Sequence, residues 1–315
     1  WRLLQVTGDV KYADIIERTL YNGFLSGVSL DGRAYFYVNP LLSHGGKTRQ
    51  EWHGCACCPP NVMRMLSSLP RFFATTDAEG LQLHQFAQMT IKTTLPGGES
   101  IELAVDTNYP WDGSIVVRII DAPGTPWTLS LRHPDWCTAS DTTVEGVTIQ
   151  PNWDNDYMHY THAWKPGHAI IYNLHTDPHL VEAHPAIDAT RGTVAIQRGP
   201  LLYCLEGLDQ SVDVLQASVK PETEFEDVPE PDLLNGCVTL EFEGQVPQFG
   251  DWDGKLYQAY NPDYVPVQLK AVPYHLWSNR DDGPMVMWLP NIAYTRSLED
   301  FIQLDAKDNQ GNQNT

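Results

Sequence analysis

From residue 80 onward, the sequence consists of short segments in which apolar residues alternate with polar ones or run together, with turn residues between them. Examples are LQLHQFAQMTIKTT (81–94), ESIELAV (99–105), GSIVVRII (113–120), HAIIYNL (168–174) and CVTLEFE (237–243), separated by turns such as PGGES and APGTP. Many short strands with turns between them are typical of antiparallel β-sandwiches. This pattern constrains most of the chain to a mainly β fold.

The β region is long enough for two sandwich domains. The segment HPAIDATRG interrupts the strand pattern near residue 185, so we expect a first sandwich over residues 78–184 and a second over residues 185–302. The acidic, proline-rich segment KPETEFEDVPEPD (220–232) is predicted to be an exposed loop. The polar residues 303–315 are predicted to form a disordered tail.

Residues 1–77 have a different pattern, which predicts helices. Apolar residues recur at helical spacing in two places: Tyr12, Ile16, Leu20 and Phe24 follow a potential cap at Asp9, and Val62, Leu66, Leu69 and Phe73 follow the helix-starting pair Pro59 and Pro60. Pro70 should kink the second helix or end its regular part. Two or three helices cannot close a core, so we expect the end of a larger helical domain. From the start at Trp1, without an initiator methionine, we expect either a fragment of a longer protein or a processed product.

Composition excludes some partners. The 315 residues carry a formal net charge of −20, so a nucleic acid or an anionic membrane surface would repel the chain. No apolar run of about 18 residues is present to span a bilayer, and we expect a soluble protein, with a cytoplasmic location slightly favoured. A neutral or cationic ligand fits this charge better. The six cysteines are too sparse for a disulfide framework, and Cys137, Cys204 and Cys237 are expected to be buried thiols.

The other three cysteines, Cys55, Cys57 and Cys58, lie together in the segment EWHGCACCPPNVMRM. A helix that begins at the following prolines would stabilise a thiolate at its N-terminus, which makes one of these thiols a plausible nucleophile. Cys57 and Cys58 can also both reach one metal ion if other ligands come from elsewhere. Inert thiols in a buried turn, or a strained disulfide between neighbouring cysteines, remain alternatives from the sequence alone.

Several segments, in order, resemble glycoside hydrolase family 127, the β-L-arabinofuranosidases. They are YADIIERTLYNGFLSGVSLDGRAYFYVNPL, WHGCACCPPNVMRMLSSLPRFF, NYPWDGSIVVRI, RHPDWC, AIQRGPLLYCLE and VPYHLWSNRDDGPMVMWLP. The resemblance implies the last helices of an (α/α)6 barrel followed by two β-sandwich domains. It also implies a zinc cofactor, a retaining mechanism with a cysteine nucleophile, and L-arabinofuranosides of plant cell-wall glycoproteins or pectin as the carbohydrate substrates.

By position in these motifs, the resemblance makes Cys57 the nucleophile and a zinc ligand, and Cys58 a second zinc ligand. Glu17 and Tyr37 match positions that line the sugar site, whereas Cys55 receives no direct role. The family supplies two further zinc ligands from a Glu-x-Cys motif and its general acid from another glutamate, all before the point where this chain begins. No Glu-x-Cys occurs here, so we expect this partial copy to be inactive alone.

Each candidate also has a simpler interpretation. Glu17 can be a solvated or capping carboxylate, Tyr37 a core aromatic, and His53 a satisfied loop histidine rather than a metal ligand. Trp52 and Trp111 can stack on sugars, although burial is the commoner role of tryptophan. For the whole chain, the alternative to an enzyme is a non-catalytic β-sandwich scaffold or carbohydrate-binding protein that carries a decayed catalytic remnant.

Overall fold

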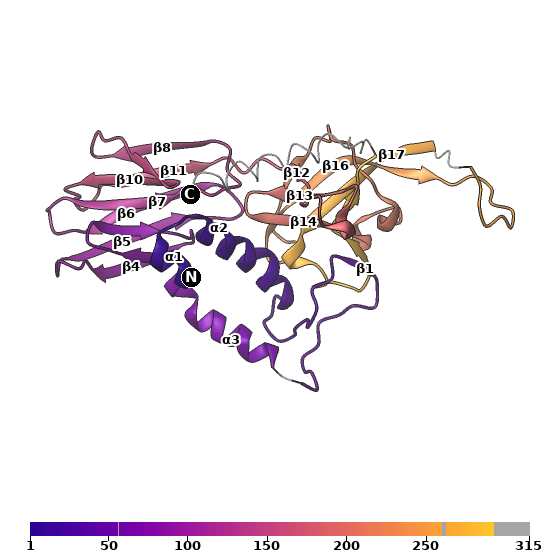
Figure 1. The fold of residues 1–315 in the computed structure, drawn as a ribbon, viewed down its shortest axis with the longest axis horizontal. Coiled ribbons are helices and arrows are strands. Elements are labelled where there is room, and N and C mark those ends of the chain that lie inside the picture. Colours follow the sequence, from indigo (N-terminus) through magenta and orange to yellow (C-terminus); the bar gives the residue numbers. More distant parts are fainter. Residues whose placement is uncertain (56, 260–262, 293–315) are drawn as a thin grey trace, which may run out of the picture.

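The computed structural model describes residues 1–55, 57–259 and 263–292. The predicted mainly β fold is confirmed: two β regions form the two ends of an elongated molecule, and a short helical region lies against both of them (Figure 1). Within the described residues, no helix is long and apolar enough to cross a bilayer. The predicted tail, residues 303–315, lies outside the described residues.

The helical region contains α1 (Arg2–Thr7), α2 (Lys11–Arg18) and α3 (Cys58–Ser68). After α2 the chain continues as a π-helical segment, Thr19–Phe24, and a 3₁₀ turn, Leu25–Gly27. The Asp9 carboxylate accepts a hydrogen bond from the backbone N–H of Lys11 at 3.1 Å. Asp9 therefore satisfies a free donor at the start of α2, as predicted, from the position before the N-cap.

The buried face of α2 is mostly polar and is not its apolar stripe. Its buried residues are Ala13, Asp14 and Glu17, whereas Tyr12 and Ile16 of the apolar stripe are only half-buried. The neighbouring sandwich provides hydrogen-bond partners for both carboxylates, so these can be buried without remaining unpaired. Apolar spacing predicted the helix, whereas the burial of its two carboxylates depends on partners in the neighbouring sandwich.

The middle β domain is a sandwich of two five-stranded sheets. One sheet has the order β2 (Ala74–Thr76), β3 (Gly80–Leu83), β7 (Trp127–Arg132), β10 (Tyr157–His162) and β9 (Asn152–Asp154). The other has the order β4 (Met89–Thr94), β5 (Ser100–Thr107), β6 (Ser114–Asp121), β11 (Ala169–Leu174) and β8 (Ser140–Glu145). Their inner faces share one core that includes Leu81, Ile101, Ile115, Leu129 and Ile170.

One pairing in this domain departs from the predicted antiparallel pattern. Strands β3 and β7 run parallel, with Leu81 opposite Leu129. The chain between them forms three strands of the facing sheet, β4 to β6, and then returns in the original direction. A parallel pair needs such a long crossover, since a tight hairpin turn only joins antiparallel strands.

The C-terminal domain is built on one nine-stranded hydrogen-bonded sheet that branches, rather than on two separate sheets. Its main path is β1 (Leu42–His44), β18 (Pro284–Val286), β14 (Leu201–Glu206), β17 (Asp263–Pro273), β16 (Cys237–Gln248) and β15 (Glu226–Glu230). The branch consists of β12 (His179–Val181), β13 (Thr193–Arg198) and β19 (Leu289–Pro290). Buried side chains form two clusters, one around Tyr203 and Leu240 and one around Cys204 and Trp277.

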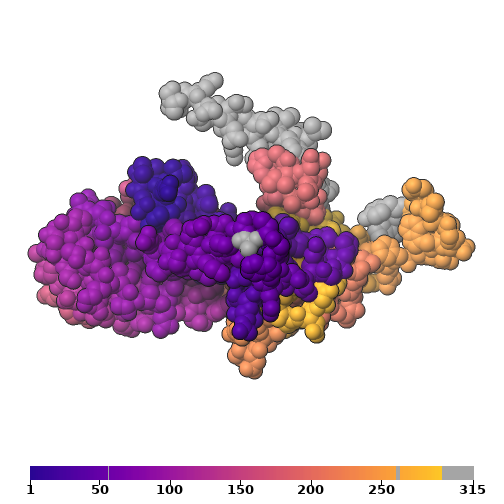
Figure 2. Space-filling view, turned by 90° about the horizontal axis from the view of Figure 1, so that it is seen from below, coloured from indigo at the N-terminus to yellow at the C-terminus, as the bar shows by residue number. Residues whose placement is uncertain are grey.

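Two features of this sheet were not predicted. Residues 226–230 of the expected acidic loop form β15, which pairs with β16 at the end of the main path. Leu42–His44, far upstream in the helical region, form β1 and pair with β18 of the C-terminal domain. The helical region therefore spans both β domains, as the view from below also shows (Figure 2).

Candidate active site

The cysteine loop ends at the beginning of α3. Cys57 is the N-cap residue, Cys58 is the first residue of the helix, and Pro59 and Pro60 occupy its first turn. Proline suits this position because the first helical N–H groups have no partner within the helix. The prediction that the three cysteines lead into a helix is confirmed. Regular α3 ends at Ser68, and Pro70 lies in the following 3₁₀ turn, Leu69–Phe72, also as predicted.

The thiols of Cys57 and Cys58 lie side by side, with their Sγ atoms 3.6 Å apart. Both are free cysteines, so the alternative of a disulfide between them is wrong in this structure. Cys55 and Cys57 are exposed, which also excludes the alternative of a fully buried turn. The Tyr37 hydroxyl lies 3.7 Å from Cys57 Sγ. The fold thus brings together three of the four residues assigned to the site, from two loops 20 positions apart.

The contacts among these groups give the two thiols different acidities. Hydrogen bonds from Tyr37, Cys58 and Cys55, in that order of size, lower the pKa of Cys57. The same contact with Cys57 raises the pKa of Cys58, and the Cys57 thiol raises the pKa of Tyr37 to about 12. Cys57 is therefore the thiol that these contacts favour as a thiolate, while Tyr37 and Cys58 serve as donors to it.

His53 supports this arrangement, although the sequence assigned it no role in the site. Its ring lies edge-on to the Tyr37 ring, with centroids 4.3 Å apart, and its Nε2 lies 3.2 Å from the Tyr35 carbonyl oxygen. The simpler interpretation of a satisfied loop histidine fits this hydrogen bond. The only sequence signal for its location was its position two residues before Cys55. Trp52 is 77% exposed, so the expectation of a buried tryptophan was wrong there.

The two neighbouring thiols match half of a tetrahedral zinc shell. Two thiolates about 2.3 Å from one tetrahedral zinc lie about 3.8 Å apart, close to the 3.6 Å between Cys57 Sγ and Cys58 Sγ. Across the described residues, no group of three or more His, Cys, Asp or Glu side chains is arranged to hold one metal ion. The residues present therefore fit two of the four ligands that a structural or catalytic zinc site requires.

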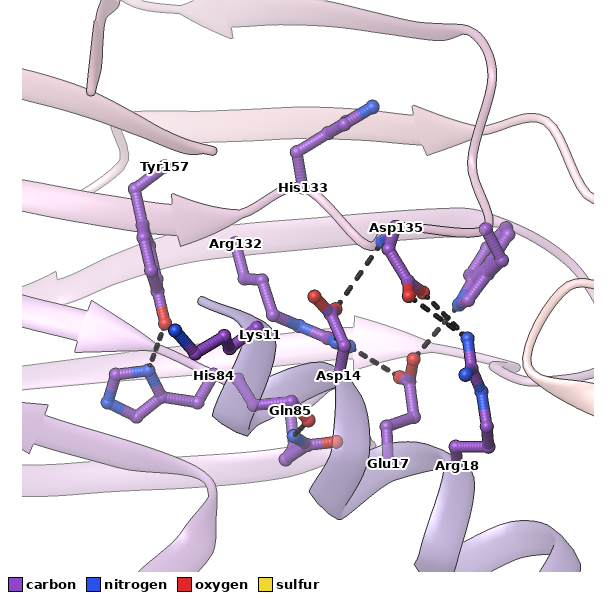
Figure 3. Close-up of polar contacts among 12 residues, drawn as sticks. Lys11, Asp14, Glu17, Arg18, His84, Gln85, Arg132, His133, Asp135 and Tyr157 are labelled. Carbon is purple, nitrogen blue, oxygen red and sulfur yellow. Dashed lines mark hydrogen bonds and ion pairs between the residues drawn. The ribbon is translucent and has the colours of Figure 1, made fainter. Parts of the chain in front are cut away.

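Glu17 lies outside this cluster, in a buried polar interface between α2 and the middle sandwich (Figure 3). It is 1% exposed, so its interpretation as a solvated carboxylate was wrong. Its Oε1 accepts hydrogen bonds from Arg132 Nη2 at 2.6 Å and from the Tyr109 hydroxyl at 2.5 Å, and its Oε2 accepts one from Trp136 Nε1 at 2.9 Å. Three donors from the middle domain thus hold this carboxylate, and its predicted sugar-binding role stays a prediction.

The same arginine also pairs with Asp14, one turn earlier on α2. Arg132 Nη1 donates to Asp14 Oδ1 at 2.6 Å, and Arg132 is fully buried. Burial raises the pKa of Asp14 to about 6, and the nearby Arg132 opposes that rise. Gln85 completes the interface by donating from Nε2 to the Ala13 carbonyl at 2.9 Å. This network fixes α2, and therefore the segment that follows it, on the middle domain.

Three family models match the chain in order. Residues 1–71 match the catalytic domain of glycoside hydrolase family 127, residues 80–176 its middle domain, and residues 178–290 its C-terminal domain. The chain belongs to glycoside hydrolase family 127. The whole cysteine loop and all of α3 fall inside the catalytic-domain match. The two β regions correspond to the family's middle and C-terminal domains.

Individual relatives agree with the family assignment. The chain is 29% identical, over 310 residues, to a non-reducing end β-L-arabinofuranosidase from Bifidobacterium longum, covering 90% of this chain and 46% of that protein. It superposes with a TM-score of 0.86 on a family 127 β-L-arabinofuranosidase from Geobacillus stearothermophilus, at 34% identity, covering 92% of this chain and 48% of the other. Another family 127 β-arabinofuranosidase gives a TM-score of 0.85 at 32% identity. The chain thus spans about half the length of these relatives.

Proposed function

We propose that this chain is part of a retaining exo-glycosidase that removes non-reducing-end β-L-arabinofuranosyl groups, with Cys57 as its nucleophile. The observation that carries this proposal is the exposed Cys57 thiol at the start of α3, which Tyr37 and Cys58 contact and whose pKa these contacts lower. A family 127 catalytic-domain match that contains this loop supports it. The names of the relatives support the choice of sugar.

In the first step, the Cys57 thiolate attacks the anomeric carbon of the arabinofuranose. The carbon–sulfur bond forms as the bond to the leaving oxygen breaks, and a general acid gives that oxygen its proton. In the second step, water attacks the same carbon and Cys57 leaves as a thiolate, while the general acid of the first step, now deprotonated, takes the proton that the water releases. Two inversions at one carbon retain its configuration. The Tyr37 hydroxyl is placed to donate to Cys57 Sγ whenever the sulfur carries negative charge.

Zinc bound by Cys57 and Cys58 would keep the attacking sulfur deprotonated near neutral pH and fix its direction. The family pattern supplies the two other ligands and the general acid outside this chain, and no Glu-x-Cys occurs in the sequence. We therefore propose that the chain is inactive alone and contributes to catalysis in a protein of the relatives' full length. Its substrates would be L-arabinofuranosides of plant cell-wall glycoproteins or pectin, neutral sugars that a chain of charge −20 does not repel.

Serine substitutions in a protein of the relatives' full length test this proposal. Cys57→Ser should reduce turnover by about 10⁴-fold or more while the protein stays folded, because a serine hydroxyl is a far weaker nucleophile than a thiolate at neutral pH. Cys58→Ser should lose activity mainly through zinc, so added zinc should restore part of it. Cys55→Ser is the control from the same loop and should change turnover by less than about tenfold.

Near-normal hydrolysis by the Cys57→Ser protein would contradict the proposal. A full-length protein that folds and binds the sugar but does not hydrolyse it would instead support the alternative of a non-catalytic carbohydrate-binding protein.

A further inference from the structure

Arg49 connects the segment before the cysteine loop to the C-terminal domain. It is 9% exposed, and its Nη1 donates to the backbone carbonyls of Trp277 at 2.8 Å and Ser278 at 3.0 Å. Its Nη2 donates to the Ser26 carbonyl, after α2, at 2.7 Å. A single buried guanidinium therefore joins three segments that are far apart in the sequence. Lysine cannot reproduce this arrangement, because one ammonium lacks the planar set of donors.

The same guanidinium also fixes Phe36, the residue before Tyr37. The Arg49 guanidinium carbon lies 4.5 Å from the centre of the Phe36 ring, and Phe36 stacks on Trp277 with ring centres 5.2 Å apart and planes 15° apart. Both contacts favour one orientation of the Phe36 ring. Since residue 37 follows directly, they also limit where the Tyr37 hydroxyl can lie.

The C-terminal loop that receives Arg49 has an unusual backbone. Ser278 has a φ of 53°, in the left-handed region that a serine rarely adopts. Its backbone N–H donates to Glu206 Oε1 at 2.9 Å, and its hydroxyl donates to the Lys47 carbonyl at 2.9 Å. A strained residue persists only where its surroundings hold it in several ways. Here those contacts turn the Ser278 carbonyl toward Arg49.

Backbone hydrogen bonds also join the segment that carries Tyr37 directly to the segment that carries Arg49. Tyr35 and Gln50 exchange two backbone hydrogen bonds, each of 2.9 Å. Tyr35 lies two residues before Tyr37, and Gln50 directly follows Arg49. A continuous set of contacts therefore runs from the Trp277–Ser278 loop through Arg49 and Phe36 to Tyr37, and from there to Cys57 at 3.7 Å.

We propose that Arg49 is a positioning residue, which uses the Trp277–Ser278 loop of the C-terminal domain to hold the Tyr37 hydroxyl against Cys57 Sγ. The importance of this positioning role for catalysis rests on the proposed function. The geometry itself can be measured in this chain without any turnover. A merely structural Arg49 would stabilise the fold and leave the reactivity of Cys57 relative to its neighbours unchanged.

The test is the rate of carboxamidomethylation of Cys57 by iodoacetamide, measured by peptide mass spectrometry as a ratio to Cys55 in the same molecules. Arg49→Lys should lower this ratio about threefold, because the Tyr37 hydroxyl is then no longer held where it can donate to the Cys57 sulfur. Tyr37→Phe should lower it equally, and Arg49→Lys should add nothing in the Tyr37→Phe background.

The matched control is Arg198→Lys. Arg198 is also a buried arginine of this chain, but it pairs with Asp227 at 2.8 Å within the C-terminal sheet, away from Tyr37. This variant should lose stability and keep the wild-type labelling ratio. If Arg49→Lys does not fold, Phe36→Leu removes the stacking contact and should lower the ratio in the same way.

An unchanged ratio in Arg49→Lys or Phe36→Leu, an unchanged ratio in Tyr37→Phe, or equal losses in Arg49→Lys and Arg198→Lys would each overturn the proposal. Failure of the proposed function would be seen separately, as the absence of a covalent sugar on Cys57 in the full-length protein. That result would leave these labelling ratios unaffected.

Discussion

Cys57 and Cys58 are neighbours in the sequence, yet the structure places them in different surroundings. Cys57 receives the contacts of Tyr37 and Cys58, which lower its pKa, while its presence raises the pKa of Cys58. This difference favours Cys57 over Cys58 as the thiolate, which is the basis for proposing Cys57 as the nucleophile. The residue that sets it, Tyr37, comes from another loop, and its distance from Cys57 follows from the fold.

The buried pair of Glu17 and Arg132 should stabilise the interface between α2 and the middle domain. Glu17→Gln leaves the fully buried Arg132 with one carboxylate partner fewer, so it should lower the free energy of unfolding by about 3 kcal/mol. Urea unfolding monitored by tryptophan fluorescence measures this change. The control is Glu102→Gln, which removes a surface pair with Lys92 and should cost less than about 1 kcal/mol. Equal costs for the two variants would show that the buried network does not stabilise the interface.

His84 should make the stability of the fold depend on pH. Its Nδ1 lies 2.6 Å from the Tyr157 hydroxyl, and burial, with a smaller effect of Arg132, lowers its pKa to about 4. Between about pH 6.5 and 4 the unfolded chain therefore binds a proton that the folded chain does not. Stability from this group is present above pH 6.5 and is lost as the pH falls toward 4.

Comparison of the wild type with His84→Gln isolates that effect. The wild type should lose up to about 3 kcal/mol more than the variant between pH 6.5 and 4 in urea unfolding. The pKa of Asp14, raised to about 6 by burial, contributes with the opposite sign, but Asp14 is present in both proteins and cancels in the difference. Parallel curves across this range would mean that folding does not lower the pKa of His84.

At the scale of secondary structure, the sequence correctly predicted the features that depend on nearby residues. The proline pair correctly placed the start of α3, Pro70 its end, and alternation most of the strands. It could not predict features that depend on distant partners. The parallel pairing of β3 with β7, the addition of β1 to the C-terminal sheet and the polar buried face of α2 all require knowledge of what lies opposite.

The close approach of β3 and β7 makes Gly80 a test of that unpredicted pairing. A Cβ atom at Gly80 would lie 1.9 Å from the Thr128 carbonyl oxygen, a backbone atom that cannot move without breaking the sheet. Gly80→Ala should therefore cost about 3 kcal/mol or more of stability. At Gly54, by contrast, an added Cβ has no heavy atom within 4 Å, so Gly54→Ala is the matched control and should be nearly neutral. Urea midpoints that are equal for the two variants would contradict the parallel register.

At the scale of the whole molecule, the helical region is attached to both β domains. The Asp14, Glu17 and Arg132 network holds α2 on the middle domain, and β1 with Arg49 holds the following loops on the C-terminal domain. Tyr37 lies between these two attachments in the sequence, and the cysteine loop follows the second one and leads into α3. The two β domains therefore hold the chain on both sides of Tyr37 and up to the start of the cysteine loop. The sequence predicted the order of the three regions but not these contacts between them.

Zinc binding tests the division of the site between this chain and the rest of a full-length protein. Two thiolates form an incomplete tetrahedral shell, so the 315-residue chain should bind zinc weakly, and a protein of the relatives' full length should bind one equivalent tightly. Metal analysis after dialysis measures both. Cys58→Ser in the longer protein is the control and should release most of the metal. Tight stoichiometric zinc in the short chain would contradict the proposed ligand set.

The proposed function requires that Cys57 forms the covalent bond to the sugar. A full-length protein treated with an arabinofuranosyl electrophile that traps the glycosyl-enzyme, followed by digestion and peptide mass spectrometry, locates that bond directly. We expect one label per molecule, on Cys57, and none in the Cys57→Ser protein. A label that forms consistently on Cys58, or on a carboxylate, would contradict it.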